Sequence, residues 1–191
     1  MADRKRAASE IYELYVDLED IEPPIWRRLL VPATITLPRL HGLLQLAMGW
    51  TNSHLHCFTF GKKTFGMAEV DDFGEVKMLD ERRQTLGAAL GEDIREFHYE
   101  YDFGDSWRCR IAAAPVVRPN REWHYPLCTG GARAAPPDDV GGAPGYEEFL
   151  LAIEDPKHKE HESMLVWIGG AFDPEGFDLN AINRTLRFGR P

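Results

Sequence analysis

Two short segments carry side chains at spacings that suit a divalent metal ion. His54 and His56 lie two residues apart in "SHLHCF", so on a strand both imidazoles leave the same face. Asp102 and Asp105 lie in "YDFGDSW". Histidine nitrogens and carboxylate oxygens are ordinary ligands of zinc, and carboxylates also suit magnesium. We therefore predict His54, His56, Asp102 and Asp105 as ligands of a divalent metal, although no motif in the sequence requires a cofactor.

The same residues have a structural interpretation that needs no ion. Gly104 supplies the left-handed turn position, and the two aspartates around it bond to turn amides. The histidines are then hydrogen-bonded residues of a sheet. The triplet "DFG" also occurs in protein kinases, but the glycine-rich loop and the catalytic loop of that class are absent from this sequence.

The segment "CTGGARAAPPDDVGGAPGYEEF", residues 128–149, combines glycines, prolines and two adjacent carboxylates. It lacks the lysine and the spacing of a phosphate-binding P-loop. Glutamates in the first turn of the following helix would also repel an anion there. We predict an ordered connection from a sheet to helices, in which Asp138 and Asp139 either cap turns or face the "DFGD" turn.

Alternation of apolar and polar residues predicts hairpins that build an antiparallel sheet. In residues 11–20 the buried set is every second residue from Tyr12 to Leu18. The predicted hairpins are residues 11–32, 54–70 and 95–117. In the last of these, Glu100 or Asp102 is expected to pair with Arg108 or Arg110 across the strands.

Helical spacing predicts one leucine-rich helix over residues 36–50, with Thr36 as its N-cap, which packs on the sheet. A short helix is expected at residues 85–90. Three further helices follow at the C-terminus, in residues 144–156, 155–170 and 177–188, the last capped by Asp178. The fold class is therefore α+β, with a flexible N-terminus at residues 1–9 and one domain over residues 10–188.

Composition narrows the class of protein. The 191 residues include 43% hydrophobic side chains, and 31 acidic residues exceed 22 basic ones. A net-negative chain repels nucleic-acid phosphates unless its basic residues gather on one face. No apolar run approaches the roughly 20 residues of a membrane helix. Three cysteines without a CxxC pair indicate reduced thiols, so we expect a cytoplasmic protein that does not enter the membrane.

Four segments together resemble the plasmid pRi ORF-three-like family, whose members also carry the label of an insertion-element passenger protein with resolvase activity. The segments are "PPIWRRLLVP", "LLQLAMGWTNSHLHCF", "YEYDFGDSWRCRI" and "CTGGARAAPPDDVGGAPGYEEFL", followed by "FDPEGFDLNAIN". The resemblance covers roughly residues 10–188. It implies a single α+β domain associated with mobile elements, and it implies no established reaction.

The chain departs from the family pattern at several positions. Ala135 and Val140 stand where relatives often have cysteine, which leaves Cys128 alone and argues against a thiolate metal cluster. Asp138 stands where glutamate is usual, and Cys109 where histidine is frequent. Neither the nucleophilic serine domain nor the C-terminal tyrosine set of known recombinases is visible, so the sequence argues against recombinase chemistry.

Two functions follow from the sequence. The first is a binding or adaptor domain associated with mobile elements that engages a protein or nucleic-acid partner through aromatic and arginine side chains. The alternative is a metal-assisted hydrolase or nuclease built from the "HLH", "DFGD" and "PPDD" segments. No feature of the sequence selects an oligomeric state. The candidate binding residues are Trp26, Arg27, His54, His56, Asp102, Asp105, Trp107, Asp138, Asp139 and Tyr146.

Overall fold

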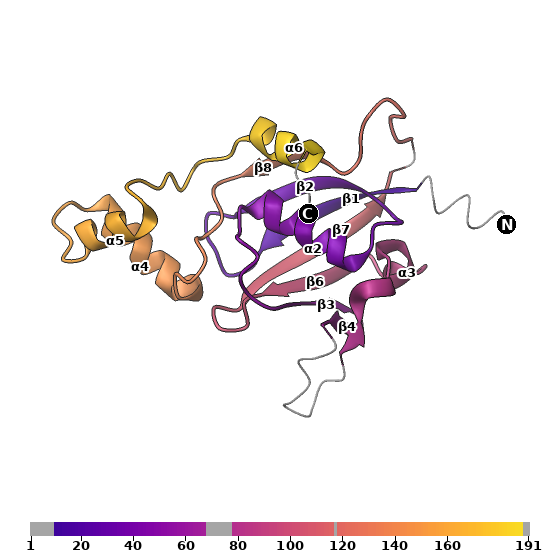
Figure 1. The fold of residues 1–191 in the computed structure, drawn as a ribbon, viewed down its shortest axis with the longest axis horizontal. Coiled ribbons are helices and arrows are strands. Elements are labelled where there is room, and N and C mark those ends of the chain that lie inside the picture. The colour runs from indigo at the N-terminus through magenta and orange to yellow at the C-terminus, as the bar shows by residue number, and fades with distance from the viewer. Residues whose placement is uncertain (1–9, 68–77, 117, 189–191) are drawn as a thin grey trace.

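A computed structural model describes residues 10–67, 78–116 and 118–188 (Figure 1). The predicted flexible N-terminus, residues 1–9, lies outside these described residues. One sheet of eight strands has the order β5-β4-β3-β6-β7-β1-β2-β8. The strands are β1 Ile11–Leu18, β2 Trp26–Pro32, β3 His56–Phe60, β4 Lys63–Gly66, β5 Leu79–Asp80, β6 Glu96–Tyr101, β7 Trp107–Pro115 and β8 Leu127–Ala132.

The three predicted hairpins are confirmed as β1–β2, β3–β4 and β6–β7. Burial alternates along β1 as the sequence predicts, since Tyr12, Leu14, Val16 and Leu18 are all buried. The pair β4–β5 is parallel, so the described sheet is mixed and not purely antiparallel. The α+β class is confirmed.

Strand β8 is a difference from the sequence-based prediction, which placed residues 128–132 in a connection. Glycines normally weaken strands, and two of them occur here. A Cβ atom at Gly131 would lie 2.4 Å from the ring of Phe177 and 2.9 Å from the carbonyl oxygen of Trp26. Glycine is therefore required so that an aromatic ring can pack directly on the backbone of this edge strand.

The ion pairs on the exposed face also differ from the prediction. Glu100 lies opposite Arg108 in the register of β6 and β7. The arginines nevertheless turn toward β1: Arg110 contacts Asp17 at 2.8 Å and Arg108 contacts Glu19 at 3.7 Å. The strand β7 has a neighbour on each side, and the carboxylates near β1 are the ones that these long side chains reach.

The helices are α2 Leu37–Met48, α3 Leu86–Leu90, α4 Gly142–Glu154, α5 His161–Ile168 and α6 Leu179–Phe188, with a 3₁₀ turn η2 at Glu81–Arg83. The predicted leucine-rich helix, the short helix and the three C-terminal helices are confirmed. Asp178 caps α6 by accepting a hydrogen bond from the amide of Ala181 at 2.8 Å. Thr36 takes the N-cap position of α2, but its hydroxyl accepts no capping hydrogen bond.

The helices occupy different places around the sheet (Figure 1). Helix α2 lies across one face of the sheet and buries Leu40, Leu44 and Met48 among other residues. Helix α6 packs beside β8, where the side-chain amide of Asn183 bonds to both the backbone N–H and the carbonyl of Cys128. Helices α4 and α5 form an arm that projects beyond one end of the sheet. The buried apolar side chains still form one cluster, which extends from the sheet to Tyr146 and Phe149 of α4.

Arg27 joins α2, β2 and β8 through one buried guanidinium. The side chain donates hydrogen bonds of 2.8 Å to the carbonyl oxygens of Ala47, Trp26, Ala132 and Arg133. Its burial lowers its pKa from 12.5 to about 10. The guanidinium fork supplies several donors in a fixed plane, and a lysine ammonium cannot reproduce that arrangement. Arg27 is therefore a structural anchor and is not available to a partner at the surface.

Arg27→Lys should lower the free energy of unfolding by about 2–4 kcal/mol, because it leaves buried carbonyl groups without donors. Urea denaturation of the purified variant measures this change. Arg28→Lys is the matched control, since Arg28 is exposed on the same strand, and it should change stability by no more than about 0.5 kcal/mol. Equal effects of the two substitutions would show that Arg27 anchors nothing.

Candidate metal centre

Three side chains from separate loops converge at one end of the sheet. The Nε2 atom of His54 lies 3.5 Å from Oδ2 of Asp102 and 3.2 Å from Oδ1 of Asp139. Their ligand atoms all lie within 4.8 Å of one another. The Nε2 atom is buried, yet its contacts form no hydrogen bond within the described chain. A buried ring nitrogen that faces two carboxylates without bonding to either is the arrangement expected of ligands directed at a common cation.

The turn after β6 directs Asp102 toward His54. The residue has a left-handed backbone, with φ of 57°. Its Oδ1 atom accepts hydrogen bonds from the amides of Gly104 and Asp105, at 2.9 and 3.3 Å. The left-handed positions of the turn are Asp102 and Ser106, and not Gly104 as predicted. The turn bonds expected of Asp102 are thus present, and they occupy only one of its carboxylate oxygens. The other oxygen remains directed at His54.

Asp105 holds the turn against the loop that carries Asp139. Its Oδ2 atom accepts a hydrogen bond from the amide of Gly141 at 3.0 Å. The two backbones touch, because a Cβ atom at Gly142 would lie 2.7 Å from the carbonyl oxygen of Asp105. The predicted metal ligand Asp105 is therefore a brace between loops and lies outside the candidate ligand set.

Asp138 fixes the same loop to the chain that follows α2. Its Oδ2 atom accepts hydrogen bonds from the amide and the hydroxyl of Thr51. The indole N–H of Trp50 donates to the carbonyl of Pro136 at 3.0 Å. These contacts leave the side chain of Asp139, which is 71% exposed, directed at His54. The adjacent carboxylates thus have separate roles, one in the brace and one in the ligand set.

The distances at this site fit a small divalent cation. Four ligands at 2.0–2.1 Å from zinc are separated by about 3.3 Å along the edges of a tetrahedron. The contacts of His54 with Asp102 and Asp139, at 3.5 and 3.2 Å, are close to that edge. One imidazole and two carboxylates supply three ligands, as in catalytic zinc sites, and leave a coordination position open for water or substrate. Among the described residues no other three side chains of these types bring their ligand atoms as close together.

His56, one of the four ligands predicted from sequence, belongs to a buried pair beside the candidate centre and lies outside the candidate ligand set. Its Nε2 atom lies 3.1 Å from Oε2 of Glu81, and both side chains are almost fully buried. The His56 ring stacks on that of His41, with centroids 3.5 Å apart and planes inclined by 3°. Strand β3 begins at His56, so His54 lies in the preceding loop and its ring does not follow the alternation of the strand.

A closed hydrogen-bond circuit fixes the tautomer of His41. Its Nε2 atom lies 2.6 Å from the carbonyl oxygen of the Asn52 side chain, which can only accept, so Nε2 carries the proton. Its Nδ1 atom then accepts from the hydroxyl of Tyr99 at 2.7 Å. Gln45 donates to that hydroxyl and accepts from the amide of Asn52, at 2.9 Å each. Burial and the adjacent His56 lower the pKa of His41 to about 4, so this ring is neutral at pH 7.

Two of the candidate ligands, His54 and Asp102, open with the histidine pair into one pocket of about 610 Å³, whereas Asp139 lines a different pocket. His54 and Asp102 contribute to the wall of the first pocket together with His41, His56 and Glu81. The buried pair of His56 and Glu81 therefore lies in the wall of the same pocket as His54 and Asp102.

The remaining candidate binding residues lie elsewhere. Trp107 and Tyr146 are 2% and 1% exposed, so both belong to the core and neither reaches a partner at the surface. Trp26 is half-buried on the sheet, where its ring stacks on Tyr15 with centroids 5.5 Å apart. Arg27 is the anchor described above. Sheet periodicity explains Trp107, which faces the core from β7, whereas Tyr146 is buried on α4.

Sequence-based reasoning did not select Glu81, Asn52, Gln45 or Tyr99. Glu81 lies in a single 3₁₀ turn within an acidic and basic segment, where it has no periodic signal. The polar residue Gln45, in the apolar face of α2, was a usable signal. A glutamine at that position needs a partner inside the protein.

The three cysteines offer no thiolate ligand. All three are free and buried. Burial raises the pKa of Cys57 to about 11 and also raises the pKa values of Cys109 and Cys128. Their thiols are therefore protonated near neutral pH, as expected for packing residues.

The neutral state of His41 predicts a pH dependence of stability. Between its ordinary pKa of 6.5 and its folded value of about 4, the unfolded chain binds a proton that the folded chain does not. The free energy of unfolding should therefore fall as pH decreases through this window, by up to about 3 kcal/mol. Urea denaturation between pH 4 and pH 7 measures the contribution as the difference between the protein and its His41→Gln variant.

Glutamine keeps a donor and an acceptor at position 41 but does not titrate. The free energy of unfolding of the His41→Gln variant should therefore lack this part of its pH dependence. His124→Gln, at an exposed histidine, is the control and should retain it. An unchanged slope in the His41→Gln variant would refute the assignment of a neutral, buried imidazole.

Within the residues that the structure describes, no helix has the length and apolar character needed to cross a membrane. The family model described as plasmid pRiA4b ORF-3-like protein matches residues 10–181. An uncharacterized protein, y4hQ, from Sinorhizobium fredii is 36% identical over 179 residues, which cover 93% of this chain and 91% of the relative.

A solved structure shows the same fold. The crystal structure of a protein of unknown function, MM3350 from Methanosarcina mazei Go1, superimposes with a TM-score of 0.78 at 36% sequence identity. The match covers 89% of this chain and 96% of the archaeal chain. The family match, the identity to y4hQ and this shared fold confirm the resemblance noted in the sequence: the chain belongs to the plasmid pRiA4b ORF-3-like family.

Proposed function

We propose that this protein is a metal-assisted hydrolase whose divalent cation is held by His54, Asp102 and Asp139. The observation that carries the proposal is the convergence of these three side chains around a buried ring nitrogen that has no hydrogen-bond partner in the described structure. The sequence pointed to metal chemistry in the same segments. The proposed set keeps His54 and Asp102 from the four ligands predicted from sequence. It omits His56 and Asp105, which have other contacts, and adds Asp139.

An ion pair alone accounts poorly for the site. A protonated His54 between two carboxylates would form a charge-assisted hydrogen bond with at least one of them, at about 2.7–2.9 Å. The observed contacts are 3.2 and 3.5 Å and lack hydrogen-bond geometry. Three ligands directed at a dication would explain both the His54–carboxylate distances and the grouping of two negative charges.

The pocket also supplies a proton acceptor. A bound divalent cation lowers the pKa of water and polarises a substrate oxygen. His56 and Glu81 line the same pocket and are bonded to each other, so Glu81 orients the imidazole. We assign proton transfer to His56 and its orientation to Glu81.

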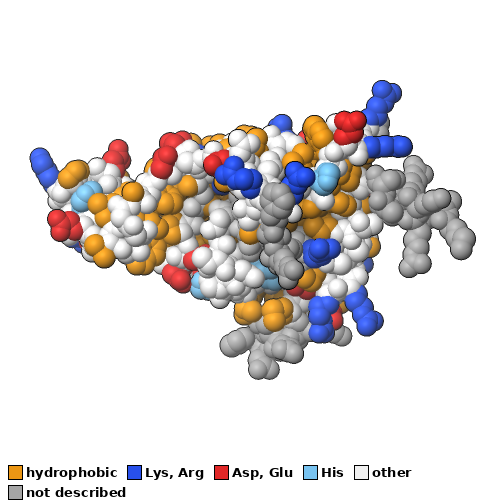
Figure 2. All heavy atoms as spheres, turned by 45° about the horizontal axis from the view of Figure 1, so that its top comes forward, with side chains coloured by type: hydrophobic (Ala, Val, Ile, Leu, Met, Phe, Trp, Pro, Cys, Tyr) orange, Lys and Arg blue, Asp and Glu red, His pale blue; other side chains and the backbone are white. Residues whose placement is uncertain are grey.

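A second candidate function, the binding or adaptor role, rests on a different observation. The arm of α4 and α5 exposes large apolar side chains, with Leu151 at 53%, Val166 at 80% and Trp167 at 46% of their surface. Figure 2 shows hydrophobic side chains over this arm. Exposed aromatic and aliphatic clusters of this kind are typical of protein interfaces. The arm is therefore the surface on which we place a protein partner.

The proposed cellular setting follows from the thiols and the family. Three free, buried cysteines fit a reducing compartment, so we propose a cytoplasmic location. The name of the family refers to a plasmid reading frame, which supports an association with mobile elements. Neither proposal depends on the metal centre.

Titration of chelator-treated protein with Zn²⁺ or Mn²⁺ tests the metal centre. We expect one ion per chain by isothermal calorimetry, and about 2.7 kcal/mol of added stability at a free metal concentration 100 times the Kd. His54→Ala and Asp139→Asn should each weaken binding by more than about 100-fold, since loss of an outer-shell partner alone costs 10- to 100-fold.

Asp105→Asn is the matched control for the metal titration. Its amide oxygen can still accept the Gly141 hydrogen bond, and its position in the "DFGD" turn is next to the ligands. It should bind the metal as the unmodified protein does. A site that survives Asp139→Asn, or a protein that takes up no ion, would contradict the proposed centre.

Affinity capture from cell extract tests the adaptor role. Val166→Asp places a charge in the exposed apolar cluster and should abolish capture of a partner, whereas His54→Ala should leave it intact. Quantitative mass spectrometry of the captured proteins provides the measurement. The adaptor role would be excluded if Val166→Asp retained the same proteins.

A further inference from the structure

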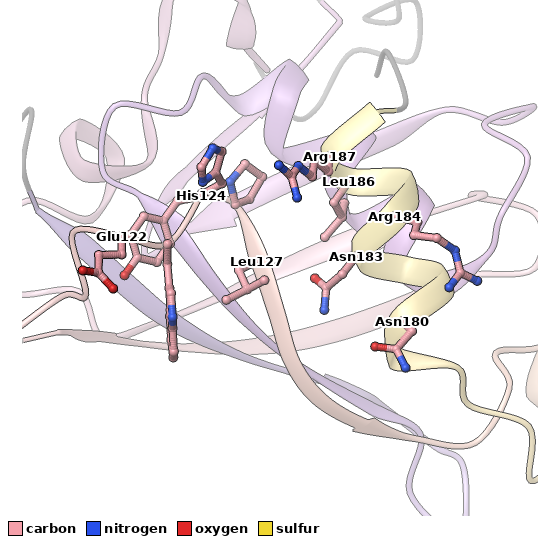
Figure 3. Close-up of a pocket in the computed structure, with 11 residues that line it drawn as sticks. Glu122, His124, Leu127, Asn180, Asn183, Arg184, Leu186 and Arg187 are labelled. Atoms are coloured by element: carbon pink, nitrogen blue, oxygen red, sulfur yellow. The ribbon is translucent and has the colours of Figure 1, made fainter.

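Two adjoining hollows form a groove between α6, α2 and the loop that precedes β8. Their volumes are about 630 and 390 Å³, and both are lined by Tyr125, Pro126, Leu186 and Arg187. In the larger hollow, Glu122 and His124 belong to the loop, and Asn180, Asn183 and Arg184 to α6 (Figure 3). None of the lining residues belongs to the pocket of the candidate metal centre. The groove is therefore a separate feature of the surface.

The walls of this groove are rich in arginine, although the chain as a whole is acidic. Arg184 and Arg187 line it from α6, and Arg39 lines it from α2. Glu122 is the one carboxylate among its described lining residues. The net charge of the whole chain is −9. A concentration of arginine in such a chain is the condition under which phosphate groups can bind.

An exposed indole adds a second kind of contact. Trp123 lines the larger hollow and is 48% exposed, and Tyr125 lines both hollows. Exposure of an indole in a groove beside arginines has no evident structural purpose, because the ring buries only half of its surface. Aromatic rings beside arginines provide stacking for bases and charge for phosphates.

The groove is built on fixed elements. Helix α6 is tied to β8 by the two hydrogen bonds between Asn183 and Cys128. The hydroxyl of Tyr125 donates to the carbonyl of Asn120 at 3.0 Å and fixes the turn that carries Trp123. In Figure 3, Arg187 projects from α6 toward the loop, whereas Arg184 lies toward the outer rim. Arg187 thus faces the loop that carries Trp123, and Arg184 lies at the edge of the larger hollow.

We infer that this groove binds a nucleotide unit, with an unpaired base on Trp123 and the phosphate beside Arg187 and Arg184. The two sources of that chemistry are a single-stranded nucleic acid and a free nucleotide. The length of the groove, in which the second hollow adds Arg39, accommodates more than one phosphate. The inference is independent of the proposed hydrolase activity, since the groove and the metal pocket share no residue.

Fluorescence anisotropy with a labelled 12-nucleotide oligothymidylate at low salt tests the inference. We expect saturable binding whose logarithmic affinity falls linearly with the logarithm of salt concentration. Trp123→Ala should weaken binding by about 5- to 150-fold, as expected for the loss of one stacked base. Arg184→Gln combined with Arg187→Gln should reduce the salt slope by about 1.4, or 0.7 for each phosphate that an arginine no longer neutralises.

Arg108→Gln is the matched control, because Arg108 is an exposed arginine on the outer face of β7. It should change neither the affinity nor the salt slope. Circular dichroism and urea denaturation of each variant identify any loss of folding, and a His54→Ala protein should bind the oligonucleotide normally. The metal titration and the oligonucleotide titration can therefore fail independently, and each result tests only its own proposal.

Competition by thymidine monophosphate distinguishes the sources. Displacement of the oligonucleotide by the mononucleotide, or direct calorimetric binding of the mononucleotide alone, supports a site for free nucleotides. Binding of the oligonucleotide without such competition supports a single strand as the ligand. The inference is overturned if neither probe binds at low salt, if Trp123→Ala binds as Arg108→Gln does, or if duplex DNA binds as tightly as the single strand.

Discussion

The buried guanidinium of Arg27 is the interaction on which the rest of this structure depends. It bonds to the carbonyl of Ala47 near the end of α2, and to those of Ala132 and Arg133 at the end of β8. The chain that leaves α2 reaches His54 seven residues after Ala47, and the chain that leaves β8 reaches Asp139 six residues after Arg133. One side chain thus fixes the starting points of two loops that must meet. A buried arginine is costly unless its donors are paired, and here the paired carbonyls are those that set the geometry of the site.

Smaller contacts then complete the convergence of the loops. Trp50 bonds to Pro136 and Thr51 bonds to Asp138, so the loop after α2 lies against the loop after β8. Asp105 bonds to Gly141, which adds the turn between β6 and β7. Each of these bonds joins residues at least 36 positions apart in sequence. The ligand set is consequently supported by hydrogen bonds that do not use the ligand atoms themselves, which is what a preorganised site requires.

Much of the fold can be predicted from local sequence patterns, whereas the grouping of the candidate ligands cannot. Alternation in residues 11–18 and helical spacing in residues 37–48 are properties of contiguous residues, so both elements could be predicted. Strand β8 could not, because the requirement for Gly131 comes from Phe177, 46 positions away. The same limit applies to the ligands: His54, Asp102 and Asp139 were each selected by residue type, whereas their grouping depends on contacts between distant loops. His56 was assigned with His54 on the assumption of one continuous strand, and the strand begins only at His56.

The adjacent carboxylates of "PPDD" show how structure and chemistry divide between two neighbouring residues. The carboxylate of Asp138 accepts a hydrogen bond from the amide of Thr51, so a structural role accounts for this residue. Asp139 makes no such bond; its backbone is left-handed, with φ of 61°, and its neighbour in the ligand set, Asp102, has φ of 57°. Left-handed geometry costs a non-glycine residue roughly 1–2 kcal/mol, although aspartate tolerates it better than most. Asp102 stabilises its own turn through Oδ1, whereas its Oδ2 and the side chain of Asp139 face one unpaired ring nitrogen and make no hydrogen bond within the described structure. A cation bound between them, as proposed, would turn the repulsion of the carboxylates into attraction and would account for the left-handed backbone of both residues.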